Sequence, residues 1–222
     1  MELLLSGRLE DVISNPEYGY QLSSFDPKEE NLFEKIEELG GLPDNVKVFH
    51  APIMMWTSKL RWFIHNVEQW MKEPVIVFHP NKKVIPYFED HKIVKPESSL
   101  YCFENFPWQS KKPLRTPQDI LAWTSTNGFD VCYDYAHTNS GSIYRTFEFL
   151  ISYLPYVSVI HFSGEGHTKL TEDDWKLWER LISDETIPMR NIRYMVMEHI
   201  EYQDKIKDMN RLNKILERRF SK

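Results

Sequence analysis

Side chains able to bind a metal ion recur directly after short runs of β-branched and aromatic residues. They are histidines and carboxylates, the nitrogen and oxygen donors that suit Zn²⁺ and also Mn²⁺, Fe²⁺ or Co²⁺. These candidate ligands are His50, His79, Glu104, Asp134, His137, His161 and Glu198. No cysteine belongs to the pattern, which argues against a structural zinc finger. The pattern predicts mixed imidazole and carboxylate ligation of metal, with zinc as the first choice.

The number of candidate ligands predicts more than one ion. A zinc ion usually takes four ligands, so this set is large enough for two or three ions with one carboxylate bridging them. Several carboxylates buried together are costly unless cations balance their charge. We therefore expect the group to act as one multinuclear centre.

The runs that precede these ligands predict the elements that position them. Eight such runs alternate with segments of helical periodicity, the pattern of repeated βα units. They span residues 2–6, 20–25, 46–52, 75–80, 100–106, 131–137, 157–164 and 193–200. We predict an α/β fold, a single compact (β/α)8 TIM barrel domain over residues 1–222, with short loops because the chain is short for this fold. The ligands would then meet at the carboxyl mouth of the barrel.

Residue parity along the runs supports a barrel, because side chains two apart on a strand share a face. Small residues stand two positions before the ligands, as expected inside a barrel beneath a site. They are Val48, Val77, Cys102, Cys132, Val159 and Val196. Bulky residues stand directly before the ligands and should pack outward against helices. They are Phe49, Phe78, Phe103, Tyr133, Ile160 and Met197.

Two helices carry recognisable end signals. Asp26 and Pro27 are typical of a helix start, and the same segment ends on two glycines, 40 and 41. Thr171 is followed three residues later by Asp174, a variant of the capping box. The last helix is expected from about residue 203 to 220.

Composition bounds the partners and the compartment. The formal net charge is −6, which weighs mildly against a broad basic surface for nucleic acid. The two cysteines, Cys102 and Cys132, lie in apolar runs and suit a reducing cytoplasm. The first apolar run is too short for a signal peptide or a membrane span, so no membrane partner is expected. The oligomeric state is left open by the sequence.

At these residues the sequence resembles the xylose isomerase-like TIM-barrel superfamily, most closely the AP endonuclease family 2 (endonuclease IV-like) metal-ligand pattern. The matching motifs are HAP (His50 in FHAP), HP (His79 in FHP), a LEN-like motif (Glu104 in FEN), DxxH (Asp134 and His137 in DYAH), DxH (Glu165 and His167 in GEGH), a strand-seven histidine (His161) and a strand-eight glutamate (Glu198). The resemblance implies a three-metal zinc cluster that generates a hydroxide and clamps a phosphoester, and it adds Glu165 and His167 to the ligands.

The sequence departs from that family pattern in three places. Glu165 replaces an aspartate, Ile53 replaces the tyrosine after the HAP motif, and few residues are left for loops that penetrate DNA. The substrate could instead be a small phosphorylated sugar, with nucleic acid as the other candidate. Cations and an aromatic residue expected near the mouth are candidate substrate contacts. They are Lys82, Lys111, Arg145 and Trp108.

Two enzymatic interpretations follow, and in both Glu104 and Glu198 are the catalytic candidates. In the first, two or three metal ions generate a hydroxide that hydrolyses a phosphoester. In the second, the ligands of strands five to eight bind one ion, and the two glutamates shuttle a proton in a sugar or sugar-phosphate isomerase or epimerase. His50 and His79 would then contact sugar hydroxyls. A non-catalytic barrel remains only if the metal cluster is incomplete.

Overall fold

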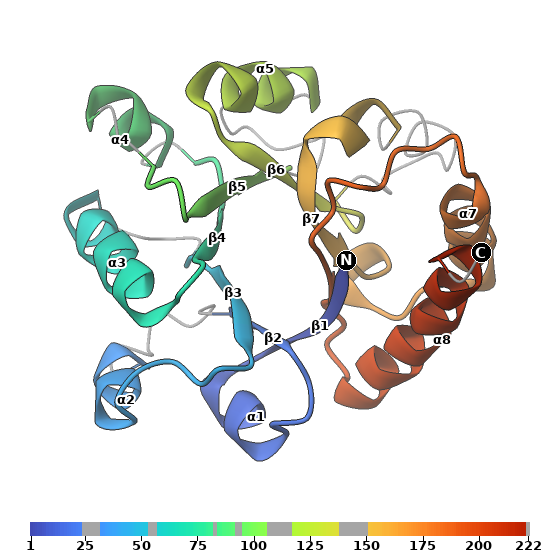
Figure 1. Ribbon diagram of the computed structural model, residues 1–222, viewed down its shortest axis with the longest axis horizontal. Coiled ribbons are helices and arrows are strands. Elements are labelled where there is room, and N and C mark those ends of the chain that lie inside the picture. The colour runs from blue at the N-terminus through green and yellow to red at the C-terminus, as the bar shows by residue number, and fades with distance from the viewer. Residues whose placement is uncertain are drawn as a thin grey trace.

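Eight parallel strands follow one another around a closed barrel in the order β1 to β8, and helices surround them (Figure 1). The strands are β1 Glu2–Gly7, β2 Tyr20–Ser23, β3 Val46–His50, β4 Val75–Phe78, β5 Leu100–Glu104, β6 Asp130–Asp134, β7 Val157–Phe162 and β8 Tyr194–Met197. The computed structural model describes residues 1–23, 32–52, 57–81, 84–91, 95–105, 117–137 and 151–220. The (β/α)8 TIM barrel predicted from the sequence is confirmed.

The helices of the described residues lie outside the strands (Figure 1). They are α1 Leu9–Ser14, α2 Leu32–Glu38, α3 Thr57–Trp70, α4 Val84–His91, α5 Pro117–Asn127, α7 Glu172–Ser183 and α8 Tyr202–Phe220, with the 3-10 turns η1 Leu154–Tyr156 and η2 Glu165–His167. The last helix therefore begins one residue before its predicted start.

The two faces of the strands differ as parity predicted. Inside the barrel is a small apolar cluster that contains all six of the small residues predicted there. The bulky residues that directly precede the ligands belong to the larger cluster between strands and helices. Side chains on one face of the strands thus fill the barrel interior beneath the mouth, and those on the other face pack against the helices.

The helix ends follow their local signals where the structure describes them. The chain leaves α2 through Gly40 and Gly41, whose φ angles of 77° and 129° favour glycine. Thr171 caps α7, and Thr171 and Asp174 form a reciprocal capping box. The predicted start at Asp26 and Pro27 lies outside the described residues.

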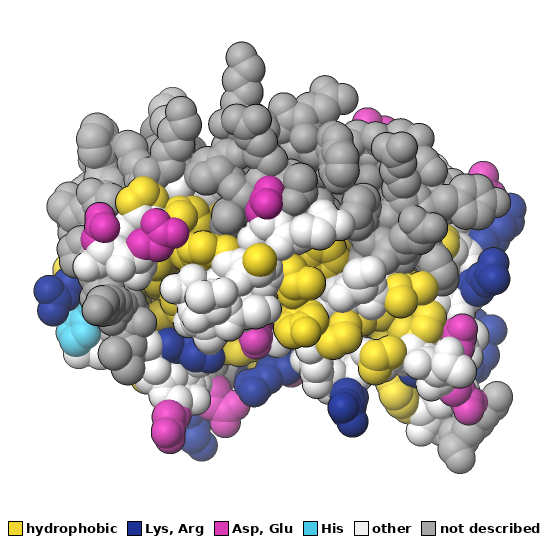
Figure 2. All heavy atoms as spheres, turned by 90° about the horizontal axis from the view of Figure 1, so that it is seen from above, with side chains coloured by type: hydrophobic (Ala, Val, Ile, Leu, Met, Phe, Trp, Pro, Cys, Tyr) yellow, Lys and Arg dark blue, Asp and Glu magenta, His cyan; other side chains and the backbone are white. Residues whose placement is uncertain are grey.

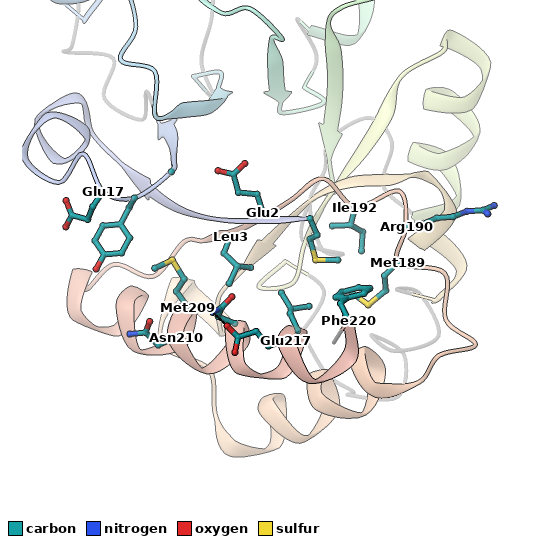
Figure 3. A pocket seen from close by; sticks show the side chains of 15 residues that line it. Glu2, Leu3, Glu17, Met189, Arg190, Ile192, Met209, Asn210, Glu217 and Phe220 are labelled. Carbon is teal, nitrogen blue, oxygen red and sulfur yellow. Dashed lines mark hydrogen bonds between the residues drawn. The ribbon is translucent and has the colours of Figure 1, made fainter. Parts of the chain in front are cut away.

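A cleft of about 870 Å³ lies at the amino-terminal end of the strands, opposite the mouth. Side chains from β1, such as Leu3, face side chains from α8, such as Met209 and Phe220, across it (Figure 3). Among the described residues that line this cleft there is no histidine and no other candidate metal ligand, so it is separate from the predicted metal centre.

The outer surface mixes residue types. Hydrophobic side chains form a band on the flank drawn in Figure 2, with acidic and basic side chains intermixed around it. Among the described residues, no helix combines the length and apolar character needed to cross a membrane.

Candidate metal centre

The strand ends deliver the predicted ligands to the barrel mouth. His50, Glu104 and Asp134 are the last residues of β3, β5 and β6, and His161 is the next-to-last residue of β7. His79 and Glu198 directly follow β4 and β8. All six side chains are buried. Parallel strands that end together on one side of a closed barrel therefore concentrate three imidazoles and three carboxylates in one volume.

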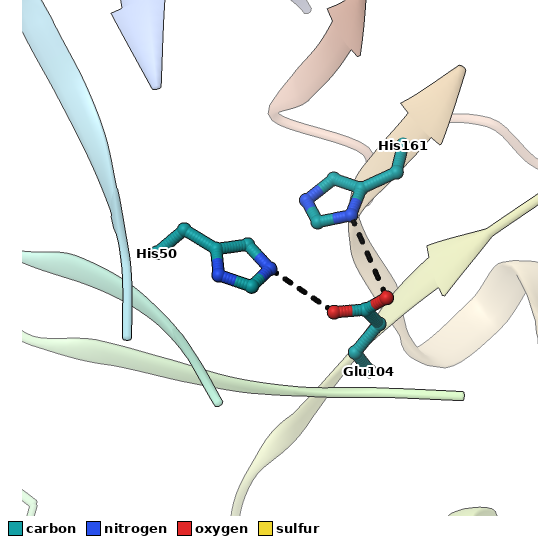
Figure 4. Close-up of side chains that lie close together, drawn as sticks. All are labelled: His50, Glu104 and His161. Carbon is teal, nitrogen blue, oxygen red and sulfur yellow. Dashed lines mark hydrogen bonds and ion pairs between the residues drawn. The ribbon is translucent and has the colours of Figure 1, made fainter. Parts of the chain in front are cut away.

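Glu104 lies at the centre of this group. His50 Nε2 is 3.0 Å and His79 Nε2 is 3.1 Å from Glu104 Oε2. His137 Nδ1 is 3.0 Å from the other oxygen, Oε1. Figure 4 shows His50 and His161 directed at opposite oxygens of this carboxylate. Engagement of both oxygens from different sides is the arrangement expected of a carboxylate that bridges two cations.

A second group of donors adjoins Glu104 through His161. His161 Nδ1 lies 3.2 Å from Glu198 Oε2 and 3.8 Å from Asp134 Oδ2. His167 Nδ1 lies 3.7 Å from the same Glu198 oxygen. The imidazoles of His137 and His167 are 5.8 Å apart between ring centroids. The second group thus extends from the buried floor toward the partly exposed rim.

Among the described residues, three sets of three ligand atoms could each hold one ion, because the atoms of each set lie within 4.8 Å of one another. The sets are His50, Glu104 and His161; Asp134, His161 and Glu198; and Asp134, His137 and His167. His79 contacts the first set through Glu104. Asp134 and His161 are shared between sets, so the donors form one connected centre.

Glu165 does not join the other candidate ligands in the described part of the chain. It belongs to η2, its side chain is exposed, and none of the three sets includes it. Gly166 and His167 follow with positive φ angles of 66° and 57°, which turn the chain sharply at this point. His167 therefore reaches the centre while Glu165 faces solvent.

The predicted substrate contacts lie outside the described residues. These are Lys82, Lys111, Arg145 and Trp108, and the same holds for Ile53. They stay predictions.

Burial and charge shift the pKa values of the carboxylates in opposite directions. Burial would raise the pKa of Glu104, but the neighbouring histidines His79, His137 and His50 outweigh it and hold the pKa well below the usual value. Burial raises the pKa of Asp134, and the nearby Glu104 carboxylate adds to the shift. The neighbouring histidines thus dominate the pKa of Glu104, and burial dominates the pKa of Asp134.

The histidines respond to the same charges. Burial would lower the pKa of His161, but Glu198 and Asp134 outweigh it and raise the pKa to about 9. Burial likewise opposes the effect of Asp134 and Glu104 on His137, whose pKa is raised to about 10. The centre therefore favours positive charge, whether carried by protons or by metal ions.

Buried atoms without hydrogen bonds test whether this set fits a cation. Asp134 Oδ2 and His161 Nδ1 are buried, and no hydrogen bond of acceptable geometry reaches either atom. Carboxylate oxygens lie near His161 Nδ1, but not in hydrogen-bonding directions. Buried polar atoms are normally satisfied, so a carboxylate oxygen and a ring nitrogen without hydrogen bonds, 3.8 Å apart, fit a divalent cation that would take the place of a proton.

Asn105 and Gln21 are polar residues of the centre that were not predicted. Asn105 accepts the backbone N–H of Asp134 through Oδ1 at 2.6 Å and donates Nδ2 to the Asp134 carbonyl at 2.9 Å. Gln21, on β2, contacts both Glu198 and His161. The parity rule applied to β2 would have placed Gln21 on the interior face, because it lies two residues from Ser23 at the strand end.

The chain is similar to known proteins in its fold and not in its sequence. No family model matches the chain, and neither does any curated protein. Endonuclease IV from Thermus thermophilus has 14% sequence identity and a TM-score of 0.59, over 98% of this chain and 100% of that one. The 3-keto-D-glucoside 4-epimerase YcjR from E. coli, in its apo form, has 13% identity and a TM-score of 0.60, over 97% of this chain and 98% of that one.

The chain shares its barrel fold with an endonuclease and an epimerase. A further solved structure, AsfvAP:AG, has 14% identity and a TM-score of 0.53, over 94% of this chain and 89% of that one. Sequence identities this low establish the fold alone. The three solved structures therefore support the barrel fold of this chain.

Proposed function

We propose that this protein is a metal-dependent phosphoesterase with two or three divalent ions, zinc first among them, at the barrel mouth. The observation that carries the proposal is the connected centre built around Glu104. Both its carboxylate oxygens face imidazoles, that of His50 at the end of β3 and that of His137 in the turn after β6. Nearby, Asp134 and His161 belong to more than one set of ligands. Donors for more than one ion favour hydrolysis over chemistry that needs a single ion.

The residues of the centre have distinct parts in this proposal. Glu104, Asp134 and Glu198 supply negative charge, and the five histidines supply nitrogen donors. When bound, divalent ions there would lower the pKa of a water to near neutrality and neutralise charge on a phosphoryl oxygen. The buried strand ends exclude bulk water from the inner side, which strengthens these electrostatic interactions.

Glu165 has a smaller part in the proposal than the family resemblance implies. Because its side chain is exposed, the ion nearest the rim would rely on Asp134, His137 and His167. We therefore propose that this position is the weakest of the three, and that the inner positions fill first.

The substrate class follows from the chemistry of the site and from the fold neighbours. A phosphorylated sugar and nucleic acid both carry the phosphoester that such a centre would bind. One neighbour is named an endonuclease, which supports nucleic acid. Lys82, Lys111, Arg145 and Trp108 are the proposed contacts to phosphate and to a sugar or base. We also propose that the protein is cytoplasmic.

The second candidate function is that of a single-metal sugar isomerase or epimerase. It is favoured by the grouping of Asp134, His161 and Glu198 in one set, with Glu104 Oε1 4.0 Å from His161 Nδ1. It is also favoured by the fold neighbour named an epimerase. Glu104 and Glu198 would then move a proton between adjacent carbons, and His50 and His79 would bind hydroxyl groups.

Metal content separates these functions. We expect two or three zinc ions per natively purified chain by elemental analysis, with hydrolysis of phosphoesters. The change Glu104→Gln keeps the shape but removes the bridging charge, so it should reduce bound metal and abolish turnover while the circular dichroism spectrum is kept. His65→Gln on the exposed face of α3 is the control and should alter neither. One ion per chain would favour the isomerase, and none would leave a scaffold.

Cleavage of abasic duplex DNA should be weak or absent, because few residues are left for loops that penetrate the duplex. The measurement compares an abasic duplex with small phosphomonoesters and phosphodiesters at equal zinc. Turnover of the duplex at the rate of a dedicated repair enzyme would contradict this expectation.

A further inference from the structure

We infer that Gln21 is a positioning residue that fixes the ring tautomer of His161 and the orientation of Glu198, so that both present lone pairs to metal. This inference rests on the proposed metal centre and adds a residue from a strand that supplies none of the predicted ligands. Gln21 lies on β2, is fully buried, and reaches across the barrel mouth to side chains from β7 and the end of β8.

The side-chain amide of Gln21 forms two hydrogen bonds of normal length. Nε2 donates to Glu198 Oε1 at 2.7 Å. Oε1 lies 2.9 Å from His161 Nε2. The partners are 177 and 140 residues away along the chain, so closure of the barrel creates this bridge.

The direction of these bonds follows from what each group can donate. An ionised carboxylate only accepts hydrogen bonds, so the amide nitrogen of Gln21 must face Glu198. The amide oxygen then faces His161, and it can only accept. Nε2 of His161 must therefore carry a proton and donate it.

This assignment leaves Nδ1 as the nitrogen of a neutral His161 that holds a lone pair. Nδ1 is the atom that faces the other ligands, 3.2 Å from Glu198 Oε2 and 3.8 Å from Asp134 Oδ2. It is also buried without a hydrogen bond. A lone pair directed among carboxylate oxygens is repelled by them unless a cation lies between. Gln21 thus holds the ring in the form that binds metal.

Glu198 is oriented by the same amide. Its Oε1 is occupied by Gln21, which leaves Oε2 directed at His161 and His167. A neutral amide can hold an imidazole and a carboxylate together without adding charge to the centre. Hydrogen-bond partners behind metal ligands typically change metal affinity by about 10- to 100-fold when removed.

His50 has a comparable anchor on its far side. Its Nδ1 lies 3.2 Å from the carbonyl oxygen of Ala51, which can only accept, so Nε2 is the nitrogen directed at Glu104. His50 is therefore oriented by a backbone carbonyl, and His161 by Gln21. If Gln21 only filled space in the core, its two hydrogen-bond partners would not both need to be candidate metal ligands.

The test compares zinc affinity and histidine protonation in the full chain. Gln21→Met keeps the length of the side chain and removes both hydrogen bonds, so zinc affinity measured by competition with a chromogenic chelator should fall about 10- to 100-fold. The zinc-loaded protein should give an NMR signal for an exchange-protected Nε2–H of His161, and Gln21→Met should lose that protection. Gln21→Glu still accepts from His161 and should retain it.

Gln69→Met is the matched control, because Gln69 is hydrogen-bonded to His65 on the exposed face of α3. It should leave zinc affinity and the His161 signal unchanged. Wild-type protein that binds zinc while Gln21→Met has the same affinity overturns this inference alone. If Gln21→Met does not fold, zinc-loaded wild type still decides: zinc on Nε2 of His161 overturns the inference, and an Nε2–H supports it. Wild-type protein that binds no zinc overturns the proposed function and this inference together.

Discussion

Glu104 and its histidines form a buried charge cluster in which each side chain is stabilised by the others. The histidine neighbours hold the pKa of this carboxyl well below its usual value, against the effect of burial. Glu198 and Asp134 in turn raise the pKa of His161 to about 9. In the absence of metal, protons on His137 and His161 balance part of the carboxylate charge. Metal binding must therefore displace protons from these histidines, so that the positive charge of the metal ions replaces that of the protons.

The stability of the metal-free protein should fall as pH rises above neutrality. The pKa of His137 is raised to about 10 and that of His161 to about 9, against an unfolded value near 6.5. A raised pKa stabilises the folded state fully below the unfolded value, and this contribution is lost as pH rises through the folded value. The midpoint of urea unfolding in chelator should decrease between pH 7 and 10.

His137→Gln is the control for this pH dependence. Cys102 and Cys132 contribute a loss in the same direction, because burial raises the pKa of their thiols. Their contribution is the same in wild type and variant, so the difference between the two isolates the histidine. An equally steep decrease in His137→Gln would contradict the assignment.

Capping of α7 is linked to the strand that carries Asp134. Asp174 accepts the backbone N–H of Thr171 at 2.8 Å in the capping box, and it accepts the hydroxyl of Tyr135 at 2.6 Å. Tyr135 directly follows the ligand Asp134 at the end of β6. One carboxylate therefore fixes both the start of a helix and the end of a ligand-bearing strand.

Removal of this link should destabilise the protein in two steps. Tyr135→Phe removes one hydrogen bond and should cost about 1 kcal/mol of unfolding free energy. Asp174→Ala removes the same hydrogen bond and also breaks the capping box, so the loss should be larger, roughly 2 to 3 kcal/mol. Denaturant unfolding measures both. Asp173→Ala, at an exposed neighbouring position, should change stability little, and an equal loss there would contradict the link.

The turn between β7 and α7 depends on the missing side chain of Gly164. A Cβ atom there would lie 2.7 Å from the carbonyl oxygen of Lys169, which is backbone and must move. The Gly164 N–H also donates to the Thr168 carbonyl at 2.8 Å, and this closes the turn that carries His167.

Gly164→Ala should therefore displace His167 and weaken the metal position nearest the rim. Elemental analysis should give fewer ions per chain, with the inner positions still filled. His167→Ala should give the same loss without the backbone change. Full metal content in Gly164→Ala, together with a loss in His167→Ala, would show that the turn tolerates the added carbon.

The alternation of residues along the sequence predicted the strands and their two faces. It could not predict contacts between elements that are far apart in the chain. Alternation along each run placed residues such as Val48 and Phe49 on opposite faces, because the strand repeat is two residues. The bridge from Gln21 to His161 depends on barrel closure, which no local repeat encodes. The exposure of Glu165 depends on positive φ angles at Gly166 and His167, and the motif spacing carries no sign of them.

The two ends of the barrel differ in chemistry across the whole molecule. The carboxyl end concentrates buried histidines and carboxylates, and the amino end has a cleft whose lining mixes apolar and polar side chains, many of them from β1 and α8. Separation of this kind lets the mouth change in chemistry while the opposite end maintains the fold. Burial of these charged side chains at the mouth costs stability, and the packing of the rest of the barrel must offset that cost.

Zinc should consequently stabilise the whole barrel. A ligand that binds only the folded state adds about 2.7 kcal/mol of stability at a concentration 100 times its dissociation constant. For a chain of this size, roughly 2 to 4 °C of melting temperature corresponds to 1 kcal/mol. Zinc should therefore raise the melting temperature of chelator-treated protein by roughly 5 to 11 °C in differential scanning fluorimetry.

Calcium and Glu104→Gln make this thermal shift specific to the centre. Calcium prefers oxygen ligands in sets of six to eight, so a histidine-rich centre should give a much smaller shift with it. Glu104→Gln removes the charge between the two groups of donors and should reduce the zinc shift. Its own metal-free melting temperature should differ from wild type, because four imidazoles lie within 4.0 Å of the carboxylate that it replaces. An equal shift with zinc in wild type and in Glu104→Gln would place the bound zinc elsewhere on the protein.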